Sequence, residues 1–331
     1  MNKRIIAVAI AGALLIIAGL SEALSATRSS GGIADTSREM LAGNMASQEK
    51  IIEQGSANSR IARIEVDGAI TSGQGTSPLG SVGYNHDKFL EKLEQIQEDD
   101  TIKGVLLYVN SPGGGVFESA QIHDKLQEMK EDGKKLYVSM GGMAASGGYY
   151  ISAPADVIYA SNETLTGSLG VIMQSINYKE LANEYGIKFN TIKSGEFKDI
   201  MSPAKEMSDE DRAILQELVD ESYQGFVDVI SEGRGMSEEQ VREIADGRIY
   251  SGQQAMDNGL VDEIGFEEDA LNALKKAIGG NPQVVEYKTN GGSLFGFPLD
   301  IQSFLPNSDV KWIEQLIQQR QGPTLMYMYA E

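Results

Sequence analysis

The chain has 331 residues, of which 28 are basic and 48 acidic, so its formal net charge is −20 at pH 7. This charge repels a phosphate backbone and argues against a nucleic-acid-binding protein. The chain has no cysteine and only two histidines, His86 and His123, which excludes cysteine proteases, disulfide frameworks and zinc sites built from cysteine or paired histidine. We expect a protein without a metal and without a cofactor, in which any hydrolytic chemistry uses serine, threonine, aspartate, glutamate, lysine or tyrosine.

The N-terminus predicts a membrane anchor over residues 1–26. Lys3 and Arg4 precede an uninterrupted run of apolar or small residues, 5–20. A helix of this length spans roughly 24 Å, and the basic flank predicts a cytoplasmic N-terminus with the rest of the chain outside the cytoplasm. A cleaved signal peptide with a cleavage site at 23–25 is the alternative. We favour an uncleaved, single-pass anchor in the cell membrane.

A folded domain is predicted at residues 60–282, after a stalk at 27–59. The stalk combines serine and glycine with a polar helical stretch at 36–54. Strands are predicted at 61–66, 105–109, 136–139, 157–160, 171–173 and 189–192, and helices at 89–97, 116–130 and 178–185. Apolar strands alternating with helices indicate βαβ units and a largely parallel sheet, so the predicted fold class is α/β.

A long helix is predicted after residue 208. Ser208 followed by Asp211 is typical of a capped helix start, and Gly233 and Gly235 predict its end. A second capped helix is predicted at Ser237, three residues before a glutamine.

The first of two glycine-rich loops, residues 110–115, follows an apolar strand and precedes a helix. It lacks the lysine of a phosphate-binding loop, and Glu118 stands where a dinucleotide fingerprint needs glycine. Three consecutive glycines, Gly113 to Gly115, can aim unhindered N–H groups at one point, as an oxyanion hole requires. A simple tight turn would explain the glycines equally well.

The second loop, residues 140–150, contains a candidate nucleophile. Ser146 lies between small residues at the predicted start of a helix, which suits a nucleophile, although a serine here can also be a helix N-cap. Ala144-x-Ser146-x-Gly148 nearly matches the nucleophile elbow of the α/β-hydrolases, but that fold needs a histidine after the serine, and both histidines precede it. A histidine base in another chain order stays open without support from the sequence.

A lysine is the remaining general base, provided that burial lowers its pKa enough to keep the amine neutral. Five lysines follow Ser146 within sixty residues: Lys179, Lys188, Lys193, Lys198 and Lys205. The residues themselves do not choose among these lysines, each of which can be a solvated surface residue. The segment 194–200 is the most suggestive, because an aromatic residue stands next to Lys198 in a loop after a predicted strand.

Five motifs together resemble the signal peptide peptidase A (protease IV) family, in particular its short Gram-positive members. Their order and spacing agree: Ser-Pro-Gly-Gly-Gly at 111–115, Ala-Ala-Ser-Gly-Gly-Tyr-Tyr at 144–150, Thr-Gly-Ser-Leu-Gly-Val at 166–171, Ser-Gly-Glu-Phe-Lys-Asp at 194–199 and Arg-Ile-Tyr-Ser-Gly-Gln-Gln-Ala at 248–255. The resemblance implies a crotonase-like, ClpP-related α/β fold. It also implies a serine protease on the outer face of the cytoplasmic membrane that degrades signal peptides after their release from secreted proteins.

The resemblance also implies roles for individual residues. Ser146 would be the nucleophile, Lys198 the general base and Ser168 the residue that orients the lysine. Backbone N–H groups of Gly113, Gly114 and Gly147 would form the oxyanion hole. Short members of the family resemble a dome-shaped octamer in which neighbouring protomers complete each site. The implied partners are therefore peptide substrates, further copies of the chain and the membrane, and not nucleic acid.

Two other functions and one role for the tail stay open. The fold family also contains acyl-CoA enzymes, and the same oligomer could be an inactive membrane scaffold. Met143 and Tyr149, which flank Ser146, are candidate groove residues. The tail, residues 283–331, is predicted to be a packing arm, and one hypothesis is that it reaches the protease groove, where it inhibits the enzyme or is trimmed.

Overall fold

The computed structural model describes residues 48–72, 84–288 and 325–328. The predicted anchor at 1–26 lies outside these ranges, as does the predicted stalk up to residue 47. Among the described helices, none is both long enough and apolar enough to cross a membrane.

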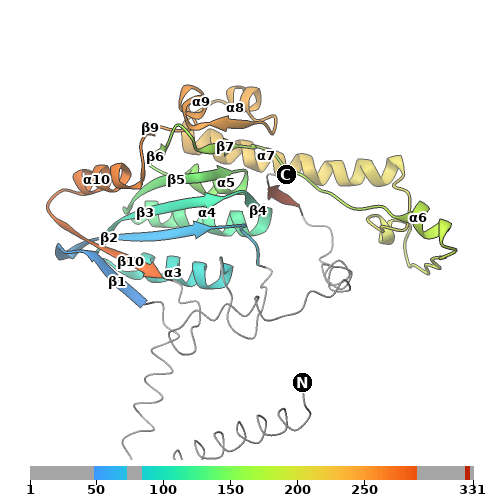
Figure 1. Ribbon diagram of the computed structural model, residues 1–331, viewed down its shortest axis with the longest axis horizontal. Helices are drawn as coiled ribbons and strands as arrows, with labels where there is room; N and C mark the ends of the chain where they lie inside the picture. The colour runs from blue at the N-terminus through green and yellow to red at the C-terminus, as the bar shows by residue number, and fades with distance from the viewer. Residues whose placement is uncertain (1–47, 73–83, 289–324, 329–331) are drawn as a thin grey trace, which may run out of the picture. The chain divides into compact units, whose positions relative to one another are not determined.

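A mostly parallel sheet forms the centre of the described body (Figure 1). Its strands lie in the order β1 (Gln48–Glu53), β10 (Pro282–Lys288), β2 (Ser56–Asp67), β3 (Ile102–Ser111), β5 (Lys135–Ala145), β6 (Val157–Ala160) and β9 (Glu263–Ile264). Two short strands branch from it, since β7 (Leu165–Gly167) pairs with β5, and β8 (Ile249–Ser251) with β7. Pairing is parallel from β10 through to β9, which confirms the predicted α/β class.

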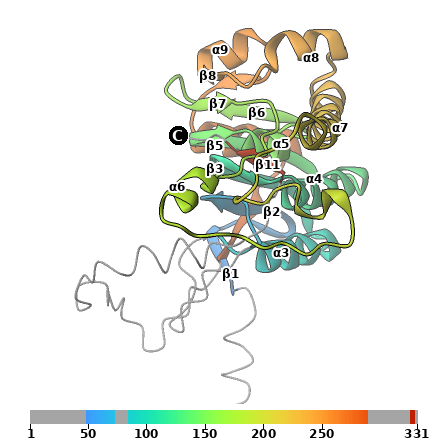
Figure 2. The same ribbon diagram turned by 90° about the vertical axis from the view of Figure 1, so that its right-hand side faces the viewer.

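Helices cover both faces of this sheet. One face carries α3 (His86–Glu98), α4 (Val116–Glu131), α5 (Gly147–Ser152) and α7 (Asp209–Arg234), and the other carries α10 (Glu267–Ile278). Figure 2 shows α3, α4 and α7 along one side of the strands. The helices α8 (Glu238–Ile244) and α9 (Gly252–Asp257) follow α7 in the chain.

The apolar run at 105–109 shows why the central strands are hydrophobic throughout. Successive residues of a strand point to opposite faces of the sheet. Val105 and Leu107 lie in the larger core with α3, α4, α5 and α7, whereas Leu106 packs with Leu274 of α10. Since both faces are covered, residues 105–107 at the centre of β3 are apolar on both sides.

Several sequence predictions were wrong. The predicted strands 171–173 and 189–192 are absent, because no neighbouring strand pairs with them; Ile172 forms only an isolated bridge with Met326. Residues 48–53 form β1 instead of the end of a helix, since they find a place in the sheet. A short apolar run becomes a strand only where a partner strand is available. The strands β1, β2 and β10 include residues outside the range 60–282 that the sequence predicts for the folded domain.

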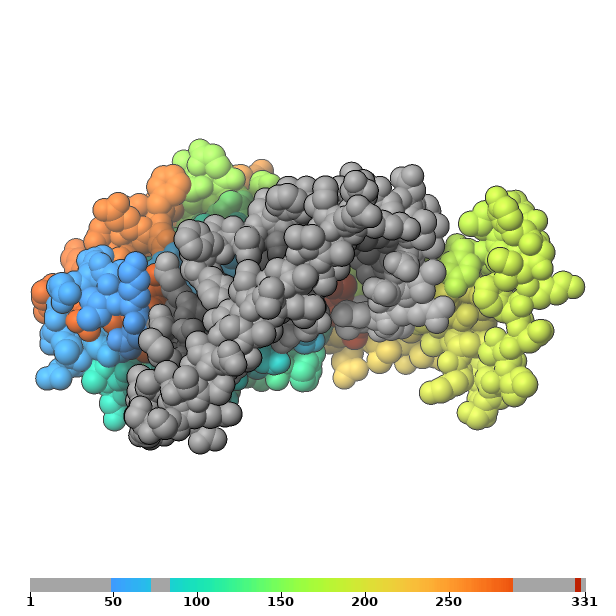
Figure 3. All heavy atoms as spheres, turned by 60° about the horizontal axis from the view of Figure 1, so that its bottom comes forward, coloured from blue at the N-terminus to red at the C-terminus, as the bar shows by residue number. Residues whose placement is uncertain are grey.

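Residues 171–208 form an extension that leaves the sheet and returns at the start of α7 (Figure 1). It contains α6 (Lys179–Glu184) and the 3₁₀ helix η2 (Glu196–Asp199). Figure 3 shows it gathered at one end of α7. Many of its large apolar side chains are exposed: Ile176, Leu181, Tyr185, Ile187, Phe189 and Ile192. So many exposed large apolar side chains in one short segment give the extension the composition of an interface.

The helix α7 begins where the sequence predicts. Ser208 Oγ accepts from the Asp211 N–H at 3.1 Å, and Asp211 Oδ2 accepts from the Ser208 N–H at 3.0 Å, which completes a capping box. Gly235 caps the other end in a left-handed conformation with φ 62°. Gly233 does not contribute to the stop, because it lies inside the helix against the carbonyl group of Ala153.

Alanine substitutions at two glycines of α7 are expected to change the free energy of unfolding in opposite directions. A Cβ on Gly233 would lie 2.7 Å from the carbonyl carbon of Ala153, whereas one on Gly225 would meet nothing within 4 Å. We therefore expect Gly233→Ala to lower the free energy of unfolding by about 1–3 kcal/mol through overpacking. Gly225→Ala should raise it by about 0.5–1 kcal/mol through helix propensity. Urea denaturation measures both, and equal effects would contradict the packing described here.

Candidate active site

Ser146 occupies a strained turn between β5 and α5, with φ 55° and ψ −115°. Among the described residues only Ser146 and Ser168 (φ 50°) combine a side chain with a positive φ. Such backbone costs about 1–3 kcal/mol and is kept where the surroundings and the function require it. The Ser146 side chain makes no capping hydrogen bond, so the N-cap interpretation fails. A strained serine between strand and helix has the geometry of a nucleophile elbow.

The register of β5 and β7 brings Ser146 and Ser168 together. Ala145 pairs with Gly167 in the parallel ladder, so both serines follow the carboxyl ends of neighbouring strands. The Ser146 N–H donates to the Gly167 carbonyl at 2.8 Å, and the Ser168 N–H to the Arg248 carbonyl at 2.7 Å. Three of the five sequence motifs therefore meet at one point.

The three candidate oxyanion glycines also meet at this point. Gly113 and Gly114 belong to β4 (Gly113–Gly115), and Gly147 begins α5. A Cβ on Gly113 would lie 2.6 Å from the Gly147 nitrogen, and one on Gly147 would lie 3.1 Å from the Gly114 nitrogen. Gly113 has φ +100°, so a side chain is excluded both by the backbone conformation and by the space. The Gly113 N–H donates to Ser111 Oγ at 3.1 Å.

The tail adds a strand to this glycine loop. β11 (Met326–Met328) runs antiparallel to β4, with Tyr327 opposite Gly114. On its other edge, Met326 exchanges two hydrogen bonds with Ile172, both at 3.1 Å. The Tyr327 carbonyl oxygen directly contacts the position of a Cβ on Gly113 and lies 3.1 Å from that of a Cβ on Gly147. The tail is thus an extended strand added to the edge of β4, with one carbonyl between the glycines.

The side chain of Tyr327 fills an aromatic pocket. It is 2% exposed, stacks on Tyr150 with ring centroids 4.8 Å apart and lies 4.6 Å from the Phe226 ring. Its hydroxyl donates to the Ser222 carbonyl at 3.0 Å. The pocket therefore suits a large aromatic or apolar side chain. The candidate groove residue Tyr149 lies in the core instead, where its hydroxyl donates to the Leu260 carbonyl at 2.9 Å.

The sequence did not point to the residues of this pocket. Tyr150 stands four positions after Ser146, which is one helical turn, and that spacing is the signal that favours it over Tyr149. Phe226 is distant in the chain and carries no local signal.

Within the described part of its own chain, no general base is hydrogen-bonded to Ser146. Its hydroxyl is buried and makes no hydrogen bond among the described residues. His86 is held by Tyr84 at 2.7 Å and Gln121 at 3.0 Å. His123 packs against Tyr150 with ring centroids 5.3 Å apart, and burial lowers its pKa despite the nearby Asp124. Neither histidine reaches the serine, and neither does Lys198, which lies exposed in η2 of the extension.

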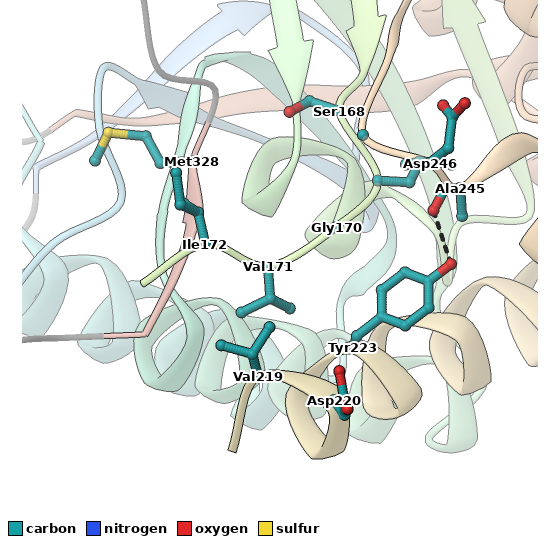
Figure 4. Close-up of a pocket in the computed structure, with 12 residues that line it drawn as sticks. Ser168, Gly170, Val171, Ile172, Val219, Asp220, Tyr223, Ala245, Asp246 and Met328 are labelled. Atoms are coloured by element: carbon teal, nitrogen blue, oxygen red, sulfur yellow. Dashed lines mark hydrogen bonds between the residues drawn. The ribbon is translucent and has the colours of Figure 1, made fainter. Parts of the chain in front are cut away.

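An open pocket of about 440 Å³ lies beside Ser168 (Figure 4). Figure 4 shows Ser168 across from Asp220 and Tyr223 of α7, with Met328 of the tail on one side. The Tyr223 hydroxyl donates to the Ala245 carbonyl at 2.7 Å. The space next to Ser168 is thus large enough for a further side chain.

Comparison with known proteins identifies the family. The model of Peptidase family S49 matches residues 128–280, and that of Clp protease matches 84–164. A putative signal peptide peptidase SppA of Enterococcus faecium is 44% identical over 265 residues, which cover 80% of this chain and 75% of that protein. The chain belongs to peptidase family S49. It is a member of the signal peptide peptidase A and protease IV group and a serine protease.

Other relatives of this S49 peptidase agree. A putative protease of Synechocystis sp. is 41% identical over 71% of this chain and 80% of that protein. Protease 4 of Haemophilus influenzae is 34% identical over 69% of this chain and 36% of its own, longer chain. These relatives favour a protease over the acyl-CoA enzyme and the inactive scaffold.

Ion pairs narrow the choice of a base for the peptidase. Three of the five candidate lysines are paired with carboxylates: Lys179 with Glu206 (3.3 Å), Lys193 with Asp199 (2.8 Å) and Lys205 with Asp211 (2.7 Å). The hydrogen bond to Asp211 raises the pKa of Lys205, which favours its protonated form. Among the described residues, Lys188 and Lys198 form no ion pair. Of these two, only Lys198 lies in the motif at 194–199.

Proposed function

We propose that this S49 peptidase is a membrane-anchored endopeptidase that hydrolyses signal peptides and similar apolar peptides through an acyl-enzyme at Ser146. The observation that carries the proposal is the position of the Tyr327 carbonyl oxygen. It lies among the candidate oxyanion glycines, next to the strained Ser146 turn. The predicted anchor at residues 1–26, with a cytoplasmic N-terminus, would keep the catalytic body on the outer face of the cell membrane.

In this mechanism, Ser146 Oγ attacks the carbonyl carbon of the peptide while Lys198 takes its proton. The same lysine then protonates the leaving amine, and a water molecule hydrolyses the ester. The N–H groups of Gly114 and Gly147 stabilise the oxyanion, because the N–H of Gly113 is engaged with Ser111. Losing one such donor typically costs ~10²–10³ in rate. The hydroxyl of Ser168 orients the neutral lysine.

We propose further that Lys198 acts in the site of a neighbouring copy. Three observations support this arrangement. Ser146 Oγ has no hydrogen-bond partner among the described residues of its own chain. A pocket next to Ser168 is open to a further side chain. The extension that carries Lys198 exposes apolar residues such as Ile187 and Ile192. A head-to-tail ring completes every site in this way, and the family resemblance favours eight copies.

The groove that holds the tail strand, between β4 and Ile172, supports a preference for extended apolar peptides. Its contacts with the peptide backbone come from β4 and Ile172, and these tolerate many sequences. Specificity then comes from the pocket of Tyr150 and Phe226, which accepts a large side chain immediately before the cleaved bond. Signal peptides supply apolar residues of this kind.

The tail itself is a proposed substrate, cleaved between Tyr327 and Met328. We expect mass spectrometry of the purified wild-type protein to show loss of the last four residues, whereas Ser146→Ala retains them, because only the wild type can attack the Tyr327 carbonyl. Tyr327→Gly is the matched control, since it empties the aromatic pocket and should leave the tail intact. An intact tail in the wild type would count against trimming and leave inhibition as its role.

A further inference from the structure

The strand β4 is built only of glycine, so no side chain of its own anchors it. One edge pairs with the tail strand β11. On the other edge, Ile70 N–H donates to the Gly113 carbonyl at 2.9 Å, and Gly115 N–H donates to the Ile70 carbonyl at 2.8 Å. The position of the oxyanion loop therefore depends on what holds the segment around Ile70.

Glu118 of α4 holds this segment. Its Oε1 accepts hydrogen bonds from both the N–H (3.1 Å) and the hydroxyl (2.5 Å) of Ser72, two residues beyond Ile70. The other carboxylate oxygen, Oε2, lies directly against Gly115, at the place where a Cβ would stand. One side chain thus contacts β4 itself and anchors the segment that pairs with it.

The charge of Glu118 suits this role. Burial by itself would raise the pKa of the carboxyl group, but the hydrogen bonds from Ser72 and from the backbone N–H of Glu118, together with the nearby His86, outweigh burial, and the pKa lies below its ordinary value. An ionised carboxylate is a stronger acceptor than a neutral group. The side chain is 9% exposed and forms no ion pair among the described residues. The two hydrogen bonds that it accepts from another residue both come from Ser72, beside the segment around Ile70.

We propose that Glu118 is a positioning residue that acts through Ser72 and Ile70 to hold β4 where Gly114 donates to the oxyanion. This inference rests on the proposed function of Ser146. It extends that function to a residue outside the five sequence motifs.

The test compares three variants with the wild type in signal-peptide hydrolysis. Glu118→Ala should lower kcat roughly 10- to 100-fold, with a smaller change in KM. A displaced Gly114 N–H weakens the hydrogen bond to the oxyanion, which forms only in the transition state. Glu118→Gln keeps an acceptor oxygen and should stay within about threefold of wild type. The control is Glu128→Ala, an exposed carboxylate of the same helix paired with Lys125 at 2.9 Å, and it should change nothing.

A peptide boronic acid, which forms a tetrahedral adduct with the serine, separates positioning from general stability. For Glu118→Ala its affinity should fall in parallel with kcat/KM. The affinity of the uncleaved peptide, measured in a Ser146→Ala background, should stay the same. Ser72→Ala removes one donor from an exposed residue and should lower both the boronic acid affinity and kcat/KM, by less than Glu118→Ala does. This variant keeps the test valid if Glu118→Ala folds poorly.

Two outcomes would overturn the proposal and are distinguishable. If wild type cuts peptides and binds the boronic acid, and Glu118→Ala and Ser72→Ala do both equally well, Glu118 has no positioning role. If wild type neither cuts nor binds, the proposed function fails and the role of Glu118 fails with it.

Discussion

Replacing Ser146 with alanine is expected to lower kcat/KM for peptide hydrolysis by about 10⁴- to 10⁶-fold, the loss typical of a removed serine nucleophile. The fold should persist, because the buried Ser146 hydroxyl makes no hydrogen bond that the substitution would break. The removal of a hydroxyl from a residue with positive φ leaves the backbone requirement of the turn unchanged. Hydrolysis of a synthetic signal peptide measures the loss, and circular dichroism checks the fold.

Ser139→Ala is the matched control. Ser139 also has a buried hydroxyl without a hydrogen-bond partner and also belongs to the β5 region, but it lies seven residues before the turn. Its replacement should leave kcat/KM unchanged. If Ser146→Ala retained activity above a tenth of wild type, another residue would be the nucleophile and the proposed mechanism would be wrong.

The second prediction concerns a mixture of two inactive variants. Ser146→Ala and Lys198→Ala should each be inactive alone, whereas mixed oligomers made by co-expression should regain about one quarter of wild-type activity. Each working site needs a serine from one copy and a lysine from its neighbour, and each is present in half of the chains. Peptide hydrolysis by the co-purified mixture measures the recovery.

Two controls sharpen this experiment. A mixture of Ser146→Ala with the double variant that also lacks Lys198 should stay inactive, because neither kind of chain carries Ser146. Lys188→Ala should stay active, which would separate the two lysines that form no ion pair among the described residues. If the mixture of single variants stays inactive while the wild type is active, Lys198 either works in its own chain or is not the base.

The sequence predicted those parts of the fold whose signals are local. The apolar run at 105–109 identified a central strand, and Ser208 with Asp211 located the start of α7, because each pattern depends on neighbours in the chain. The serine turn was predictable for the same reason. Small residues around Ser146, between a predicted strand and a predicted helix, permit a tight turn there.

The parts that the sequence did not predict depend on distant partners. Residues 48–53 form a strand because β10, over two hundred residues later, pairs with them. The pocket of Tyr150 and Phe226 joins α5 to α7, and no spacing in the chain announces that contact. The contact between Glu118 and Ser72 was equally hidden, because the sequence offered Glu118 only as a residue that spoils a nucleotide motif.

The position of the tail strand between β4 and Ile172 bears on the secondary structure that a substrate can have when it binds. A peptide in it is hydrogen-bonded on both edges, to β4 and to Ile172, so its backbone groups must be free of other partners. A peptide that spans a bilayer is helical, because its N–H and C=O groups have no other partners in hydrocarbon. If substrates bind as proposed, cleavage requires that the substrate first leave the lipid and unwind. The proposed groove would then select for chains that have lost their secondary structure, and an intact transmembrane helix or a folded protein would be spared without any recognition of its sequence.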